Sequence, residues 1–260
     1  MPTDAALFPA ASERDRPGDR PGDRTWARAV ISLGHDEYWS PAMRRTVTAA
    51  RDRGVNLAFL GANALYRRIR FEASRVGPDR TEVNYKSSAD PIADPAQVTT
   101  QWGELPSNDP GSSLVGTTYG CNVVKDDMVA VDPTSWLTRD IVHAGQRLPA
   151  MVGTEYDRVL PDRMTPHPIQ VLFHSPLICR GVPDHSDVAY YTTRSGAGVF
   201  SSGTNVWVCA LQNACADGYG GPGAGPVVVA ITTRLLTVFG QGPAGTRYPA
   251  RDTARRYVGG

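Results

Sequence analysis

The chain has 260 residues, a formal net charge of +1 and a hydrophobic content of 41%. So small a charge provides no overall field to attract nucleic acid or an anionic membrane. No apolar run approaches the roughly 18 residues of a membrane-spanning helix, and the N-terminus lacks the basic and then apolar pattern of a signal peptide. We therefore expect a cytoplasmic globular protein that binds neither nucleic acid nor membrane.

The first 24 residues differ in composition from the rest of the chain. They repeat an Arg-Pro-Gly-Asp unit and contain few apolar side chains. Such a segment cannot bury enough apolar surface to offset the entropy lost on ordering. We expect residues 1–24 to be a disordered leader, residues 25–240 to form the folded domain, and residues 241–260 to form a polar, solvated tail.

The segment from Ala29 to Leu60 predicts a strand, a helix and a second strand. Ala29 to Leu33 is a short apolar run, as in a buried parallel strand. Ser40 is a favourable N-cap, Pro41 suits the first helical position, and Gly54 suits the end of the helix. Val55 to Leu60 then predicts a second buried strand, and a right-handed crossover would make the two strands parallel.

Further elements are predicted in the second half of the chain. Apolar runs predict strands over 169–173, 188–192, 198–200 and 206–211, and the apolar spacing over 227–239 predicts a helix packed on the sheet. Together these elements predict an α/β fold.

Two polar clusters follow the two predicted strands of the first unit. The first is His35-Asp36-Glu37-Tyr38, and the second runs from Asn63 to Tyr66. Ligands of open α/β sheets bind outside the carboxyl ends of the strands. The sequence therefore predicts a site at this edge of the sheet.

A side-chain nucleophile is disfavoured at this site. The second strand ends in Gly61-Ala62-Asn63-Ala64, which has the form of a strand-to-helix elbow but places Asn at the apex. The cysteines have no zinc-ligand spacing and do not follow either strand, and we expect them to be reduced, buried thiols. They are Cys121, Cys179, Cys209 and Cys215.

Hard oxygen donors offer another chemistry. His35, Asp36, Glu37 and Tyr38 lie in a loop that leaves a strand, and Tyr66 and Glu155 are other oxygen donors. Carboxylates and phenolates suit a ferric or similarly hard cation, which could polarise a carbonyl and lower the pKa of bound water. From the residues alone, structural roles stay open. His35 could be a hydrogen-bonded structural histidine, and either tyrosine could be a half-buried ring with its hydroxyl paired.

Several motifs resemble the C-terminal domain of the large, or beta, subunit of N,N-dimethylformamidase. They run in order from about Ala29 to Phe239, over most of the chain. The first two are long and distinctive. The motifs are Gly34-His-Asp-Glu-Tyr-Trp-Ser40, Gly54-Val-Asn-Leu-Ala-Phe-Leu-Gly-Ala-Asn63, Arg68-Ile-Arg-Phe71, Gly153-Thr-Glu-Tyr-Asp157, Gly196-Ala-Gly-Val-Phe200 and Gly203-Thr-Asn-Val-Trp207.

The resemblance implies a fold and a metal. The fold would be a three-layer α/β sandwich with a mostly parallel sheet, similar to class I glutamine amidotransferases. Here it would be truncated at its N-terminal edge, because this chain lacks the β-rich part that precedes the domain in the family's large subunit. The family enzyme hydrolyses a small formamide at a mononuclear ferric iron held by two tyrosinates and a glutamate. Tyr38, Tyr66 and Glu155 are the implied ligands here. Gly153-Thr154 stands where the family would offer a histidine beside that glutamate.

Two functions are therefore expected, from different classes. In the first, the chain is an iron-dependent hydrolase of amide or other C–N bonds in a small neutral molecule. Glu37 or His35 would take a proton from water, and Asn63 would orient the substrate or the water. In the second, the chain is a non-catalytic or degenerate domain used for binding or assembly. A homo-oligomer or a small partner subunit is compatible with either.

Overall fold

The structure is a computed structural model that describes residues 27–86 and 89–258, so the expected leader over 1–24 lies outside the described residues. The helices are α1 (Pro41–Arg51), α2 (Ser112–Val115), α3 (Val206–Leu211) and α4 (Ala224–Phe239), followed by the 3₁₀ turns η3 (Ala244–Thr246) and η4 (Ala254–Arg256). The strands are β1 (Ala29–Leu33), β2 (Tyr38–Trp39), β3 (Asn56–Leu60), β4 (Arg67–Arg68), β5 (Arg70–Ser74), β6 (Gly77–Val83), β7 (Thr100–Gln101), β8 (Thr118–Val129), β9 (Arg147–Arg158), β10 (Ile169–Cys179), β11 (Val182–Thr192) and β12 (Gly198–Ser201).

The strand–helix–strand unit at the start of the domain is confirmed. The Ser40 side chain caps α1 by accepting a hydrogen bond from the Met43 backbone N–H at 3.2 Å, and Pro41 is the first helical residue. β1 and β3 then pair in parallel, from Ala29 opposite Asn56 to Leu33 opposite Leu60. The carboxyl ends of both strands therefore meet at one edge of the sheet, as the sequence predicts.

The expected sandwich with a mostly parallel sheet is wrong. Of the residues that the structure describes, 35% lie in strands and 19% in helices. The largest sheet has the order β1-β3-β12-β11-β10 and is mixed, because β1, β3 and β12 are parallel while β11 and β10 are antiparallel to their neighbours. β8 and β9 form a separate antiparallel pair.

A tight hairpin explains much of this difference. The sequence predicts two short strands over 169–173 and 188–192, but both continue until they meet at Arg180-Gly181. Both turn residues have positive φ angles, +51° and +80°. This is the conformation of the two-residue turns that join antiparallel strands. The chain therefore turns back directly at this point and makes no helical crossover.

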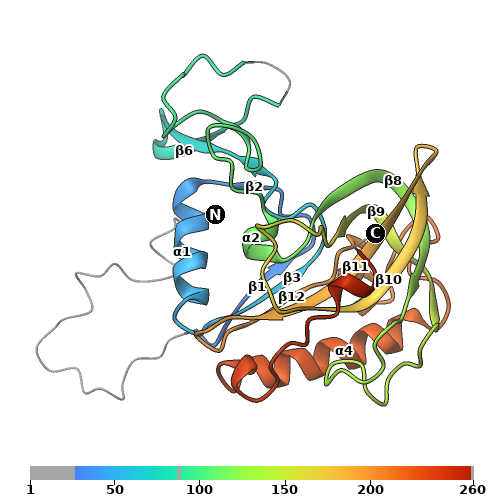
Figure 1. Ribbon diagram of the computed structural model, residues 1–260. Coiled ribbons are helices and arrows are strands. Elements are labelled where there is room, and N and C mark those ends of the chain that lie inside the picture. The colour runs from blue at the N-terminus through green and yellow to red at the C-terminus, as the bar shows by residue number, and fades with distance from the viewer. Residues whose placement is uncertain (1–26, 87–88, 259–260) are drawn as a thin grey trace, which may run out of the picture.

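The sheet carries apolar packing on both faces because side chains alternate along each strand. In β3, Leu57 and Phe59 pack in the same cluster as Val47 of α1. Ala58 and Leu60 pack in the other cluster, which includes the apolar side chains of α4. Figure 1 shows α1 and α4 on opposite sides of the strands. A buried strand was expected over Ala29–Leu33, but β1 lies at the edge of the sheet and is only partly buried. Leu33, for example, is 66% exposed.

Three other expectations differ from the structure. Residues 206–211 form helix α3 instead of a strand, because Val206, Trp207 and Ala210 lie on one helical face and are all buried. The segment after Phe239 packs back on the domain and buries Ala244, Ala250 and Val258, although a solvated tail was expected. The expectation of reduced thiols is also wrong, because the chain forms the disulfides Cys121–Cys179 and Cys209–Cys215. The first joins β8 to the end of β10.

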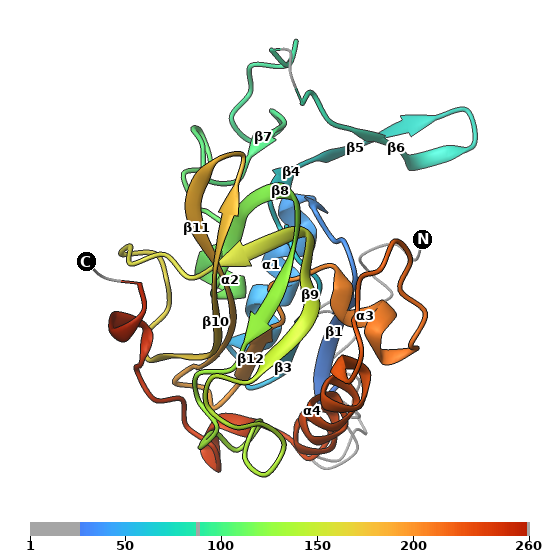
Figure 2. The same cartoon turned by 90° about the vertical axis from the view of Figure 1, so that its right-hand side faces the viewer.

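Strands β5 and β6 form a hairpin that projects away from the body in both views (Figures 1 and 2). Within the described ranges, none of the helices combines the length and the apolar character needed to cross a bilayer.

Candidate functional site

The candidate site is built where three parallel strands end. His35 and Glu37 follow β1, and Asn63 follows β3. The loop after β12 supports them, because the Asn205 side-chain oxygen accepts a hydrogen bond from the Ala62 backbone N–H at 2.8 Å. Gly61 permits this arrangement, since a Cβ at this position would lie 1.8 Å from the Gly34 carbonyl oxygen. The loops after β1 and β3 are therefore in direct contact.

Strand β9 brings Glu155 to the same place. Glu155 Oε2 accepts a hydrogen bond from Asn63 Nδ2 at 3.0 Å and lies 2.9 Å from His35 Nε2. His35 Nε2 is also 3.5 Å from Glu37 Oε2. The structure thus brings together His35, Glu37, Asn63 and Glu155, which come from three separate parts of the sequence. We call these four residues the central cluster.

Asn63 meets a backbone requirement and a side-chain requirement together. Its φ angle is +56°, in the left-handed region that Asn tolerates better than most residues. Its Nδ2 donates to Glu155, while its Oδ1 is buried and has no hydrogen-bond partner among the described residues. A buried, unpaired acceptor costs free energy. It would be satisfied by a bound water or by a ligand that carries an N–H or O–H group.

The two predicted tyrosine ligands lie around this cluster, and neither hydroxyl is hydrogen-bonded to Glu155 within residues 27–86 and 89–258. The Tyr38 hydroxyl contacts the Lys86 ammonium group. The Tyr66 ring packs against Tyr119 of β8, with ring centroids 5.3 Å apart. Tyr119 is therefore a third phenol in this region, beside Tyr66.

The protein environment raises the pKa of all three phenols above the ordinary value for tyrosine. Burial is the largest cause of the raised pKa of Tyr38; the contact with Lys86 opposes it and the neighbouring Glu37 adds to it. Burial also raises the pKa values of Tyr66 and Tyr119. A phenolate in this site would therefore need a cation beside it.

Asp157 is a further member of the site that the sequence analysis did not single out. It is two residues beyond Glu155 on β9, and its Oδ1 accepts a hydrogen bond from the Asn63 backbone N–H at 2.6 Å. Burial raises the pKa of this carboxyl to about 7, although the hydrogen bonds from Asn63 and Thr117 act in the opposite direction. The spacing offered a signal, because residues i and i+2 of a strand share a face.

Asn122 of β8 was also missed. Its Nδ2 lies 3.4 Å from Glu155 Oε1, and its oxygens accept hydrogen bonds from Arg180. Its position opposite Glu155 depends on the register of the β8–β9 pair. No pattern in the sequence specifies that register.

A comparison with known protein families shows the family to which the chain belongs. The family model for the N,N-dimethylformamidase beta subunit-like, C-terminal domain matches residues 11–217. The chain belongs to this family. The match confirms the resemblance carried by the sequence motifs and includes all four residues of the central cluster. Among curated proteins, none matches the chain.

Proposed function

We propose that this chain hydrolyses an amide or a related C–N bond in a small neutral molecule, as the family name suggests. One observation carries the proposal: Glu155 Oε2 lies within 3.0 Å of both Asn63 Nδ2 and His35 Nε2. An amide, an imidazole and a carboxylate thus converge beside a buried, unpaired acceptor. This combination can bind a polar planar substrate and move a proton.

Water is the nucleophile in this proposal. All four cysteines are in disulfides, so none can attack as a thiolate. Water would add to the carbonyl carbon and lose a proton to His35 or Glu37. The C–N bond would then break, and the same group would return the proton to the leaving amine, which yields an acid and an amine. Asn63 would orient the water or the substrate, with its free Oδ1 as the acceptor.

A hard cation fits the donors around the cluster. The site has a carboxylate and phenols and no thiolate, which suits ferric iron better than a softer ion. Glu155, Tyr66 and Tyr38 would hold it, and Tyr38 would exchange its contact with Lys86 for the ion. When bound, a mononuclear ferric ion would supply Lewis-acid polarisation of the carbonyl and a lower pKa for water.

Metal analysis of purified protein tests this proposal. We expect about one iron per chain, a visible phenolate-to-iron absorption band, and hydrolysis of a small formamide. Tyr38→Phe and Tyr66→Phe keep each ring but remove the oxygen, so each should lose the band and most of the iron. Tyr85→Phe, a change in a partly exposed tyrosine, is the matched control.

The outcomes separate the two classes of function. Full iron occupancy in Tyr38→Phe would remove Tyr38 from the ligand set. Folded wild-type protein without metal and without formamide hydrolysis would instead favour the degenerate domain used for binding or assembly.

Two contextual proposals accompany the activity. Because the family is described as beta subunit-like, we propose that the domain acts in a homo-oligomer or beside a small partner subunit. Measurement of the molar mass of the native protein would test this.

The cytoplasmic location expected from the sequence is disfavoured, since two disulfides are typical of oxidising compartments.

A further inference from the structure

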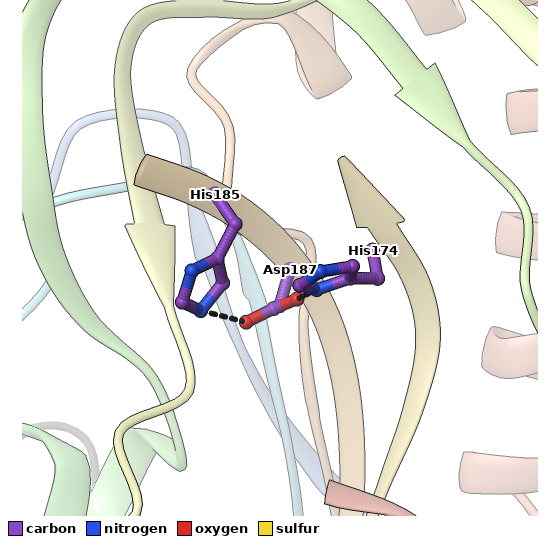
Figure 3. A group of neighbouring side chains, drawn as sticks. All are labelled: His174, His185 and Asp187. Carbon is purple, nitrogen blue, oxygen red and sulfur yellow. Dashed lines mark hydrogen bonds and ion pairs between the residues drawn. The ribbon is translucent and has the colours of Figure 1, made fainter. Parts of the chain in front are cut away.

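A second cluster of ligating side chains lies on the hairpin of β10 and β11, apart from the central cluster. It consists of His174, His185 and Asp187. His174 Nδ1 is 2.8 Å from Asp187 Oδ1, and His185 Nε2 is 3.2 Å from Asp187 Oδ2. One ligand atom from each residue lies within 4.8 Å of the other two. Figure 3 shows both imidazoles turned toward the same carboxylate.

Strand geometry builds this cluster. His174 of β10 is directly opposite Asp187 of β11, so their side chains are cross-strand neighbours. His185 is two residues before Asp187 and shares its face of β11. The hairpin is therefore a rigid frame that presents three ligands from two adjacent strands.

This second cluster is separate from the central cluster. Glu155 and Asp157 of β9 contact Asn63. The Asp187 carboxylate instead contacts the two imidazoles of its own cluster. Within residues 27–86 and 89–258, no hydrogen bond or ion pair joins a residue of one cluster to a residue of the other. The two groups of residues are thus distinct sites.

We propose that His174, His185 and Asp187 form a binding site for a divalent first-row transition metal ion such as Zn²⁺. Two imidazoles and one carboxylate are the set of three protein ligands found at many zinc sites, with a fourth position left for water. Ligand atoms about 2.0–2.1 Å from a tetrahedral ion are roughly 3.3 Å from one another. His174 Nδ1 and His185 Nε2 lie 2.8 Å and 3.2 Å from the two oxygens of Asp187, and one ligand atom from each residue lies within 4.8 Å of the others, so a shared ion is within reach of all three.

The surroundings of the cluster match those of a metal site. His185 Nδ1 lies 3.7 Å from Asp184 Oδ1, so a carboxylate faces the ring nitrogen that would not bind the ion. Such outer carboxylates fix the orientation of a metal-bound histidine. Asp187 Oδ2 accepts a hydrogen bond from the Val159 backbone N–H at 2.8 Å, which holds the carboxylate in place.

The exposure and the charge of the three side chains also suit a metal site. The Asp187 side chain is 0% exposed, while those of His174 and His185 are 16% and 22% exposed, so an ion could reach the imidazoles from solvent. A buried carboxylate needs a compensating positive charge. The competing interpretation is that a protonated imidazole supplies it and that the cluster is an ion pair only.

Titration with Zn²⁺ and with Co²⁺ as a spectroscopic probe distinguishes the two interpretations. Wild-type protein should bind one equivalent with the intense visible spectrum of four-coordinate Co²⁺. His174→Gln and His185→Gln keep much of the side-chain volume but remove a ligand. Loss of a group that only supports a ligand weakens metal binding by about 10–100-fold, so loss of the ligand itself should weaken it by about 100-fold or more. His167→Gln should bind as the wild type does, because His167 pairs with Asp252, at 3.0 Å, and is not part of the cluster.

The Glu155→Gln variant separates this site from the proposed iron site. It should lose formamide hydrolysis and keep the Co²⁺ spectrum. If Glu155→Gln abolishes Co²⁺ binding while the two His variants bind normally, the ion is at the central cluster and the present proposal is overturned. Folded wild-type protein that binds neither ion also overturns it and leaves an ion-pair cluster.

A second measurement avoids substitution altogether. An acylating reagent such as diethyl pyrocarbonate modifies accessible imidazoles, and the modified peptides can be identified by mass spectrometry. Zn²⁺ should protect His174 and His185 and leave His143 and His167 reactive. Equal modification of all four with and without Zn²⁺ would contradict the proposal, even if the His variants fail to fold.

Discussion

At the scale of single residues, Asn63 gives the clearest separation of structure from function. The left-handed backbone conformation alone would explain an Asn or a Gly at this position. The side-chain contacts with Glu155 and His35, at 3.0 and 3.5 Å, are additional. Glycine meets the backbone requirement and removes only the amide.

We therefore predict that Asn63→Gly leaves the fold intact and lowers formamide hydrolysis by roughly 100-fold, the scale of losing one group that stabilises a transition state. Asn213→Gly is the matched control, because Asn213 also has a positive φ angle and is exposed near the end of α3. Circular dichroism and steady-state kinetics measure the two effects. Unchanged kcat/KM in Asn63→Gly would reduce Asn63 to a turn residue.

The residues of the site differ in how far sequence could predict them. The sequence predicts His35, Glu37 and Asn63 at the candidate site, because each follows a strand of the β1–α1–β3 unit, whose local signals are complete. Glu155 was implied chiefly by the family resemblance, because its position depends on how β9 docks. Asp157 and Asn122 were missed for the same reason: strand pairing between distant segments determines which side chains meet.

At the scale of elements, sequence signals predict an element well when neighbouring residues determine it, as in α1. The cap, the first-turn proline and the apolar face predict α1 and its first residue, Pro41, but the helix ends at Arg51, two residues before the expected Arg53. β10 and β11 were predicted too short, because residues 174–187 are polar or mixed and their strand structure is stabilised by pairing across the hairpin. The apolar run from Val206 to Leu211 predicts a strand but forms α3, because periodicity over so short a run does not distinguish a strand from a helix.

Packing of α1 on the sheet can be tested at Val47, which is 5% exposed and packs in the cluster with Leu57 and Phe59. Val47→Ala should lower the free energy of unfolding by about 2 kcal/mol, from lost apolar burial and the cavity that remains. Arg45→Ala, on the exposed face of the same helix, should change it by less than about 0.5 kcal/mol. Chemical denaturation measures both, and equal effects would mean that α1 does not pack through this face.

At the scale of the whole molecule, the two disulfides should contribute unequally to stability. Cys121–Cys179 closes a loop of 58 residues, whereas Cys209–Cys215 closes one of 6. Loop-closure entropy predicts a loss of about 4 kcal/mol for the Cys121→Ser/Cys179→Ser double variant and about 2 kcal/mol for the Cys209→Ser/Cys215→Ser double variant. Denaturation of both variants measures this order. Four free thiols in denatured, unreduced wild-type protein would show that neither bond forms.

The docking of the C-terminal segment should depend on pH. Asp132 accepts hydrogen bonds from Gln170 and Arg251, at 2.6 and 2.7 Å. Burial opposes ionisation of Asp132, but these hydrogen bonds and those from Thr134 outweigh it, so its pKa is lowered in the folded protein. A folded-state pKa below the unfolded value of about 3.9 stabilises the fold above that pH, and the contribution is lost as the pH falls through the folded-state pKa.

The corresponding experiment compares the Tm of wild type and Asp132→Asn between pH 6 and pH 3. The variant should be less stable at pH 6, and the difference should shrink as the pH falls below about 4. Asp140→Asn is the control, because the Asp140 side chain is 84% exposed and Asn tolerates its positive φ angle. A difference that does not change with pH would assign the effect of Asp132→Asn to packing alone.

The assembly of the central cluster also has a consequence for the order in which the protein folds. Asn63 and Glu155 are 92 positions apart in the chain, and the segment between them includes the projecting β5–β6 hairpin and the whole of β8. Contacts this distant form late, because the entropy of closing the intervening loop is lost before the contact stabilises anything. A nascent or partly refolded chain can thus contain the β1–α1–β3 unit, with His35 and Asn63 at the same edge of the sheet, and still lack the Glu155 and Asp157 contacts that hold Asn63. Under the proposed function, activity would appear only when the β8–β9 hairpin docks, and it would mark the completion of folding.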